Sequence, residues 1–209
     1  MFRTADPCVG PDRDRHPGRE KISDILLGEA IFADAQARCG IVLAPRPHLV
    51  GLQLVDGECR CVEGARLFDL RDRVGVERLC IFMSPPWQHE PKPEEFRRSN
   101  DDVLAILKEW GSRAFGFVYL NPVHTKESLA ELERCVADGP MVGIKLWVGT
   151  RAQRRELDPI VRRAVELDAL IFQHTWIKQR GKGNLAQEST PMELAELSAR
   201  HPGVPMVCG

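Results

Sequence analysis

The sequence has no excess of charge of one sign, because its 29 basic residues are balanced by 30 acidic ones for a formal charge of -1. Both signs are scattered along the chain, so it presents no basic field that would attract nucleic acid or an anionic membrane. It also lacks an apolar run close to the roughly 20 residues that span a bilayer, and its first residues contain no hydrophobic signal core. These absences predict a cytoplasmic protein that binds neither nucleic acid nor a membrane.

The number and positions of the cysteines also do not indicate a disulfide framework. The seven cysteines are an odd number. Cys80, Cys135 and Cys208 stand in apolar or helical segments, where a reduced cysteine behaves as a small hydrophobic residue. What the chain does have is enough length, at 209 residues, to bury one sizeable core.

The first third of the chain divides into two regions. Residues 1–19 are rich in proline and charge and poor in apolar side chains, which predicts a disordered arm. Residues 20–64 begin with apolar residues at helical spacing, which predicts a helix that Gly40 terminates. Two apolar runs at 41–44 and 49–55 then lead to a turn signal at Asp56 and Gly57, which predicts a hairpin.

From residue 65 onward, helical and strand patterns alternate. The predicted strands are 78–83, 115–120, 141–148, 169–176 and a last one from Val204, and the predicted helices between them are 94–110, 126–137, 154–168 and 191–201. Short strands separated by helices favour right-handed crossovers and a parallel sheet. The fold class is therefore α/β, with an incomplete (β/α)8 barrel of parallel strands preferred over an open doubly wound sheet.

Two ionisable side chains interrupt the apolar strands of the 141–176 unit. Lys145 stands between Ile144 and Leu146, and His174 lies near the end of the following strand. Strands covered on both faces are almost wholly apolar, so a charge there needs a reason. Because neighbouring strand residues face opposite sides, we expect Lys145 to face the barrel lumen while Ile144 and Leu146 face the helices.

Several interpretations of these residues stay open. Lys145 could form a structural salt bridge, line a site, or use a lowered pKa to form a Schiff base with a carbonyl substrate, as an aldolase-type lyase does. His174 could be a core histidine that is hydrogen-bonded to a neighbour. His89 and His124 follow predicted strands, where barrel loops carry function, but solvated loop residues occupy the same positions.

Five short motifs stand in order at barrel-like spacing: DRVGVERLCIF (72–82), VYLNP (118–122), GIKLW (143–147), QHTW (173–176) and VCG (207–209). Together they make residues 65–209 resemble the amidohydrolase-related family of metal-dependent hydrolases and decarboxylases. The resemblance implies a divalent metal, usually zinc, at the C-terminal mouth of the barrel. It also implies a small-molecule substrate, from which a metal-activated water cleaves a C–N or ester-type bond or from which a carboxylate is removed.

In that family the metal is held by a His-x-His pair on the first strand, a histidine on the fifth and an aspartate on the eighth, with a further histidine on the sixth. By position, His174 matches the fifth-strand histidine and is the expected metal ligand. Lys145 matches the fourth-strand lysine and is expected to line the catalytic site. No other cofactor is implied.

The chain departs from the family pattern at three elements of the metal site. Residues 1–65 contain no His-x-His, since His16 and His48 stand alone; Cys59 and Cys61 have the same spacing and are an alternative zinc pair. The sixth-strand histidine would follow Gly209, and the eighth strand is absent. We therefore expect an incomplete chain that binds zinc poorly.

These departures keep a second class of function open, a catalytically inactive fragment or an interaction module. The last strand, from Val204, would leave an uncovered sheet edge. Because such an edge is a template for pairing with another chain, we expect a homo-oligomer or a partner.

Overall fold

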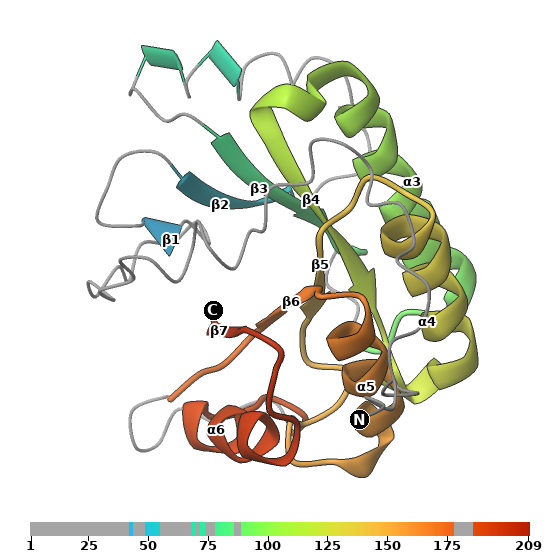
Figure 1. Ribbon diagram of the computed structural model, residues 1–209, viewed down its shortest axis with the longest axis vertical. Coiled ribbons are helices and arrows are strands. Elements are labelled where there is room, and N and C mark those ends of the chain that lie inside the picture. The colour runs from blue at the N-terminus through green and yellow to red at the C-terminus, as the bar shows by residue number, and fades with distance from the viewer. Residues whose placement is uncertain are drawn as a thin grey trace, which may run out of the picture.

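The computed structural model of the chain describes residues 42–43, 49–54, 68–69, 72–73, 78–85, 89–177 and 186–209. In this part, seven strands form one sheet in the order of the chain (Figure 1). They are β1 (Val42–Leu43), β2 (Leu49–Leu54), β3 (Arg78–Met83), β4 (Ala114–Leu120), β5 (Gly143–Leu146), β6 (Leu170–Gln173) and β7 (Met206–Cys208). The predicted arm, the predicted first helix and the turn at Asp56 and Gly57 lie outside the described residues.

The sheet is parallel from β2 to β7. β1 runs antiparallel to β2, and each later pair of neighbours is parallel. The prediction that the strands from Arg78 onward are parallel and adjacent in chain order is thus confirmed. β2 also pairs in parallel with β3, from Leu49 opposite Arg78 to Leu54 opposite Met83. The sheet therefore includes a strand from the region 20–64, which the sequence pattern places in a hairpin.

Helices of the described part cover the outer, convex side of this sheet (Figure 1). They are α3 (Pro93–Trp110), α4 (Thr125–Leu132), α5 (Asp158–Glu166) and α6 (Pro191–Arg200), with short helical turns at η1 (Gly111–Arg113), η2 (Pro122–His124), η3 (Glu133–Ala137) and η4 (Arg155–Leu157). No described helix has the length and apolarity needed to cross a membrane. The alternation of parallel strands with outer helices is the α/β architecture of an incomplete barrel.

The start of α6 shows how local sequence sets an element's boundary. Pro191 occupies the first turn, where its missing N–H needs no partner. The Thr190 hydroxyl accepts a hydrogen bond from the Glu193 N–H at 3.3 Å, and the Glu193 carboxylate accepts one from the Thr190 N–H at 2.8 Å. This reciprocal cap, which stabilises a helix by about 1 kcal/mol, confirms that the helix begins at Pro191.

The two faces of the sheet carry different side chains because strand residues alternate. The outer face packs against the helices in one large apolar core, which includes Ile81, Val118, Ile144 and Ile171. The inner face carries a smaller, aromatic cluster of Cys80, Phe82, Phe117, Leu170 and Phe172. The inner face is the barrel lumen in this fold.

Gly143 marks the closest approach between β5 and its neighbours. A Cβ at this position would lie 2.6 Å from the carbonyl oxygen of Leu170 and 2.6 Å from the ring of Phe117. Both distances are far inside van der Waals contact, and one of the atoms belongs to the backbone. The close approach therefore requires glycine.

Asp158 ties α5 to the end of α6. Its carboxylate accepts hydrogen bonds from Arg155 at 3.2 Å, Arg200 at 3.3 Å and His201 at 2.8 Å. Burial alone would raise the pKa of Asp158, but the hydrogen bonds from His201, Arg155 and Arg200 outweigh it and lower the pKa to about 2. The ionised carboxylate thus holds two outer helices together.

Strands β5 and β6 are shorter than the apolar runs that predict them. The run 141–148 contains a four-residue strand, Gly143–Leu146, although Met141 and Val148 at its ends are buried. Apolar character reports burial of the side chain, whereas strand bounds depend on backbone pairing. A buried run therefore sets the outer limits of a strand and not its ends.

Candidate functional site

Lys145 lies on the inner face of β5 with only 4% of its surface exposed. Its Nζ is 3.9 Å from the centroid of the Phe172 ring and 4.9 Å from that of Phe82. Both rings present a face to the ammonium, a favourable cation–π arrangement. The side chain thus points into the lumen, as the alternation of the sequence predicts.

The described residues place no carboxylate in contact with Lys145. Within the described part of the chain, its Nζ forms no ion pair, so the salt-bridge interpretation finds no partner there. Cys80 and Tyr119 share this inner face, and burial raises the pKa of both, so both stay neutral at physiological pH. Burial lowers the pKa of Lys145 to about 7, from an ordinary value of 10.5. The lysine is therefore poised between its charged and neutral forms.

Tyr119 stands beside Lys145 on the neighbouring strand. The register places Tyr119 opposite Lys145, and Lys145 opposite Phe172. Residues opposite one another in parallel strands project from the same face. Three side chains from β4, β5 and β6 therefore form one row across the inner face near the ends of the strands.

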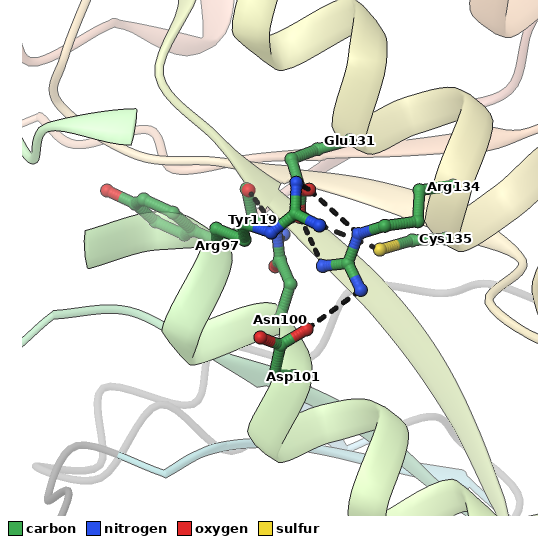
Figure 2. A network of polar contacts seen from close by, with 7 residues as sticks. All are labelled: Arg97, Asn100, Asp101, Tyr119, Glu131, Arg134 and Cys135. Carbon is green, nitrogen blue, oxygen red and sulfur yellow. Dashed lines mark hydrogen bonds and ion pairs between the residues drawn. The ribbon is translucent and has the colours of Figure 1, made fainter. Parts of the chain in front are cut away.

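The backbone of this row is anchored from outside by Asn100 of α3 (Figure 2). The Asn100 amide donates to the Tyr119 carbonyl at 3.1 Å, and its carbonyl oxygen accepts from the Tyr119 N–H at 2.8 Å. The same amide also donates to Glu131 at 3.0 Å. One buried side chain thus satisfies both polar groups of a strand residue and links it to α4.

Glu131 is the centre of the polar network in Figure 2. Its carboxylate accepts from Arg134 at 2.8 and 2.6 Å and pairs with Arg97 at 3.3 Å. Arg134 continues the network to Asp101 at 2.8 Å. Burial raises the pKa of Glu131, but the hydrogen bonds from Arg134 and Asn100 outweigh it and lower the pKa below its usual value. The network fixes α3, α4 and β4 relative to one another.

His174 follows β6 directly at the C-terminal edge of the sheet. The backbone N–H of His174 donates to the Leu146 carbonyl at 2.8 Å, and its ring Nε2 lies 3.1 Å from a carboxylate oxygen of Glu188. Glu188 is 2% exposed. His174 comes two residues after Phe172, which pairs with Lys145. The two predicted site residues therefore lie at the same edge of adjacent strands.

The loops that follow β3, β4 and β5 meet at this edge. The ring of His89 packs edge-on against that of Trp147, with centroids 5.5 Å apart. Asn121 donates to the Pro91 carbonyl at 2.9 Å, which ties the loop after β4 to the loop after β3. His124 ends the turn η2 and takes part in none of these contacts between loops. The structure thus brings His89, but not His124, into the group of loops at the mouth.

A metal site is not completed by the described residues. Within them, no group of three or more His, Cys, Asp or Glu side chains is placed to hold a metal ion. His174 and Glu188 supply two donors, whereas a catalytic zinc needs about three protein ligands. His16, His48 and the cysteines at 59 and 61 lie outside the described part. No metal-dependent step can be assigned to the described residues.

The curved parallel sheet and the outer helices define part of a β/α barrel, with ionisable groups at the C-terminal ends of its strands. The family model for amidohydrolases matches residues 78–209, which is more than half of the chain. The chain belongs to the amidohydrolase family. No curated protein sequence matches it.

Solved structures with the same fold include 2,6-dihydroxybenzoate decarboxylase from Rhizobium, with 18% identity and a TM-score of 0.56 over 68% of this chain and 54% of that one. Dihydroxybenzoic acid decarboxylase from Polaromonas, with bound manganese and 2-nitroresorcinol, has 19% identity and a TM-score of 0.53 over 69% and 53%. 5-Carboxyvanillate decarboxylase from Novosphingobium aromaticivorans, with manganese and a nitrobenzoic acid, has 19% identity and a TM-score of 0.57 over 69% and 48%. The chain spans about half the length of these structures.

Sequence reasoning missed Asn100, Glu131 and Glu188. Asn100 stands within the apolar stripe of its helix, since it comes four residues after Phe96 and three before Val103, all of them fully buried. A polar residue inside such a stripe is a detectable signal of a buried hydrogen bond. Glu188 follows a polar loop and carries no comparable signal.

Proposed function

We propose that the chain forms part of an amidohydrolase-type site that binds a small aromatic carboxylate, and that the enzyme to which this site belongs decarboxylates it. The observation that carries the proposal is Lys145, a buried lysine with aromatic neighbours and no carboxylate among its described contacts. Its position near the end of a barrel strand is where such folds place substrate groups.

A carboxylate ligand would supply the counter-charge that the described contacts of Lys145 lack. The Nζ would donate hydrogen bonds to it, and bringing the negative charge close would favour the ammonium form of Lys145. A charge-assisted hydrogen bond of this kind contributes roughly 1.5–3 kcal/mol, which corresponds to about 10- to 100-fold in affinity.

The aromatic wall suits the rest of such a ligand. Phe82 and Phe172 meet edge to face with centroids 5.6 Å apart, and Phe117 lies 6.4 Å from Phe172. Aromatic rings pack favourably in offset or edge-to-face arrangements at these distances. A flat ring beside Lys145 would extend the existing cluster.

Decarboxylation is proposed over hydrolysis of a C–N or ester-type bond. Support comes from the three structural relatives above, each of which is a decarboxylase of an aromatic acid by its name. Two of them hold manganese, which favours a divalent metal in this family without favouring zinc. In this chain, His174 is the proposed ligand, and the remaining ligands would have to come from outside the described residues.

The proposal is tested by calorimetric titration of the chain with 2,6-dihydroxybenzoate. We expect binding that weakens about 10- to 100-fold in Lys145→Met and is unchanged in Lys126→Met, which removes an exposed lysine from α4. Equal affinity in both variants, or no binding by the unsubstituted chain, would contradict the proposal.

A further inference from the structure

The burial of Lys145 has a chemical consequence that carboxylate binding does not use. A buried lysine normally pairs with a carboxylate, because the charged form is costly to remove from water. Here the described surroundings of Nζ are two phenyl rings at 3.9 and 4.9 Å. Neither ring can donate a hydrogen bond, so among these described contacts the nitrogen lone pair is unshared whenever the ammonium deprotonates.

The Lys145 ammonium deprotonates to a large extent at neutral pH. Burial lowers the pKa of Lys145 to about 7. At that pH roughly half of the side chain is a free amine, whereas an ordinary exposed lysine with a pKa near 10.4 is free roughly 10³-fold less often. A free amine is the nucleophilic form of lysine, and desolvation in an apolar pocket is one way in which proteins activate it.

We infer that Lys145 is a carbonyl-reactive lysine that condenses with a small aromatic aldehyde or ketone to form an imine in the lumen. The amine nitrogen attacks the carbonyl carbon, and a C–N bond forms. The carbonyl oxygen then leaves as water with the two protons that nitrogen gives up. No oxidant, reductant or metal is needed, and the burial of Lys145, Phe82 and Phe172 opposes hydrolysis of the product.

The aromatic class of partner follows from the same contacts. An alkyl carbonyl would leave the ring faces of the cluster with little to pack against, whereas a flat aromatic aldehyde adds a further ring to the cluster that already includes Phe82, Phe117 and Phe172. This inference is independent of the proposed decarboxylation, because it uses the neutral amine and not the ammonium.

The test is reductive trapping on the intact chain. The protein is incubated with benzaldehyde and sodium cyanoborohydride at about pH 7, digested, and mapped by mass spectrometry for lysines that carry one benzyl group. We expect Lys145 to be labelled at least tenfold faster than Lys108 and Lys126, both exposed. Faster labelling of these two exposed lysines than of Lys145 would overturn the inference, whether the aldehyde fails to reach Lys145 or Lys145 stays protonated.

Two controls make the result specific. In Lys145→Met the fast label should disappear while the far-UV circular dichroism stays that of the folded chain; fast labelling that persists would place the reactive amine elsewhere and refute the inference. Phe172→Leu removes the closest ring and leaves the amine in place. Labelling of Lys145 should then fall severalfold, because the benzaldehyde ring loses the ring against which it packs. An unchanged rate would contradict the role of the cluster.

Competition separates this inference from the proposed function. Excess 2,6-dihydroxybenzoate should slow the labelling of Lys145 if both hold. Fast labelling without protection would support the imine and remove support for carboxylate binding at Lys145. Slow labelling in a chain that still binds the carboxylate would overturn the imine alone.

Discussion

Replacing Lys145 by methionine should stabilise the folded chain, which is unusual for a substitution in a core. A shift of one pKa unit corresponds to 1.36 kcal/mol, so a fall from 10.5 to about 7 corresponds to about 5 kcal/mol of destabilisation by the buried amine. The gain expected from Lys145→Met is therefore up to about 5 kcal/mol at and below neutral pH, since methionine fills a similar volume without a charge.

The gain should depend on pH with a defined sign. Between about pH 7 and 10.5 the unfolded chain binds a proton on Lys145 that the folded chain does not bind, so the stability of the unsubstituted chain rises with pH in this window. Below about pH 7 the full cost is present. The advantage of Lys145→Met should thus be largest below neutral pH and shrink toward pH 10.5.

Urea unfolding at about pH 6 and about pH 10 measures both quantities. Lys126→Met is the matched control, because it removes an exposed lysine and should change the free energy of unfolding by less than about 0.5 kcal/mol. A variant Lys145→Met that is less stable than the unsubstituted chain, or a gain that does not change with pH, would refute the reasoning.

Four further predictions concern the frame of the site and its metal content. Asn100→Leu should lower the free energy of unfolding by roughly 3 kcal/mol, because it leaves the backbone N–H and carbonyl of Tyr119 without their side-chain partner and removes one of the hydrogen bonds to Glu131; a loss below about 1 kcal/mol in urea unfolding would contradict this. Gly143→Ala should cost a few kcal/mol by the same assay, about as much as other overpacked core positions, and a neutral effect would show that β5 can shift. Asp158 has a folded pKa of about 2, below its ordinary 3.8, so its contribution of roughly 2 kcal/mol should be present above pH 4 and lost as the pH falls toward 2; Asp158→Asn should remove that pH dependence, and an unchanged acid transition would argue against it. After dialysis the chain should retain less than one divalent metal ion, and elemental analysis that finds stoichiometric zinc, lost in His174→Ala, would show that residues outside the described part complete the site.

The order and direction of the strands were predictable because each parallel strand in this fold is a short apolar run between amphipathic helices. β3 matches its predicted bounds from Arg78 to Met83. The parallel pairing of β2 was not predictable in the same way. An apolar run is compatible with a hairpin or with a crossover, and only the tertiary structure decides between them.

The placement of the two candidate site residues, Lys145 and His174, was predictable, because each is a polar residue in an apolar strand. That signal places both residues at one edge of the sheet but says nothing of what surrounds them. The two ring faces on Lys145 and the carboxylate of Glu188 beside His174 come from distant segments. Such contacts depend on how strands and loops meet in space, which one sequence does not show.

The most direct test of the central claim is a crystal structure of the chain with bound 2,6-dihydroxybenzoate. The account predicts the carboxylate within about 3 Å of the Lys145 Nζ, with the ligand ring against Phe82 and Phe172. A ligand bound elsewhere, with the two phenyl rings still closed over Lys145, would contradict it.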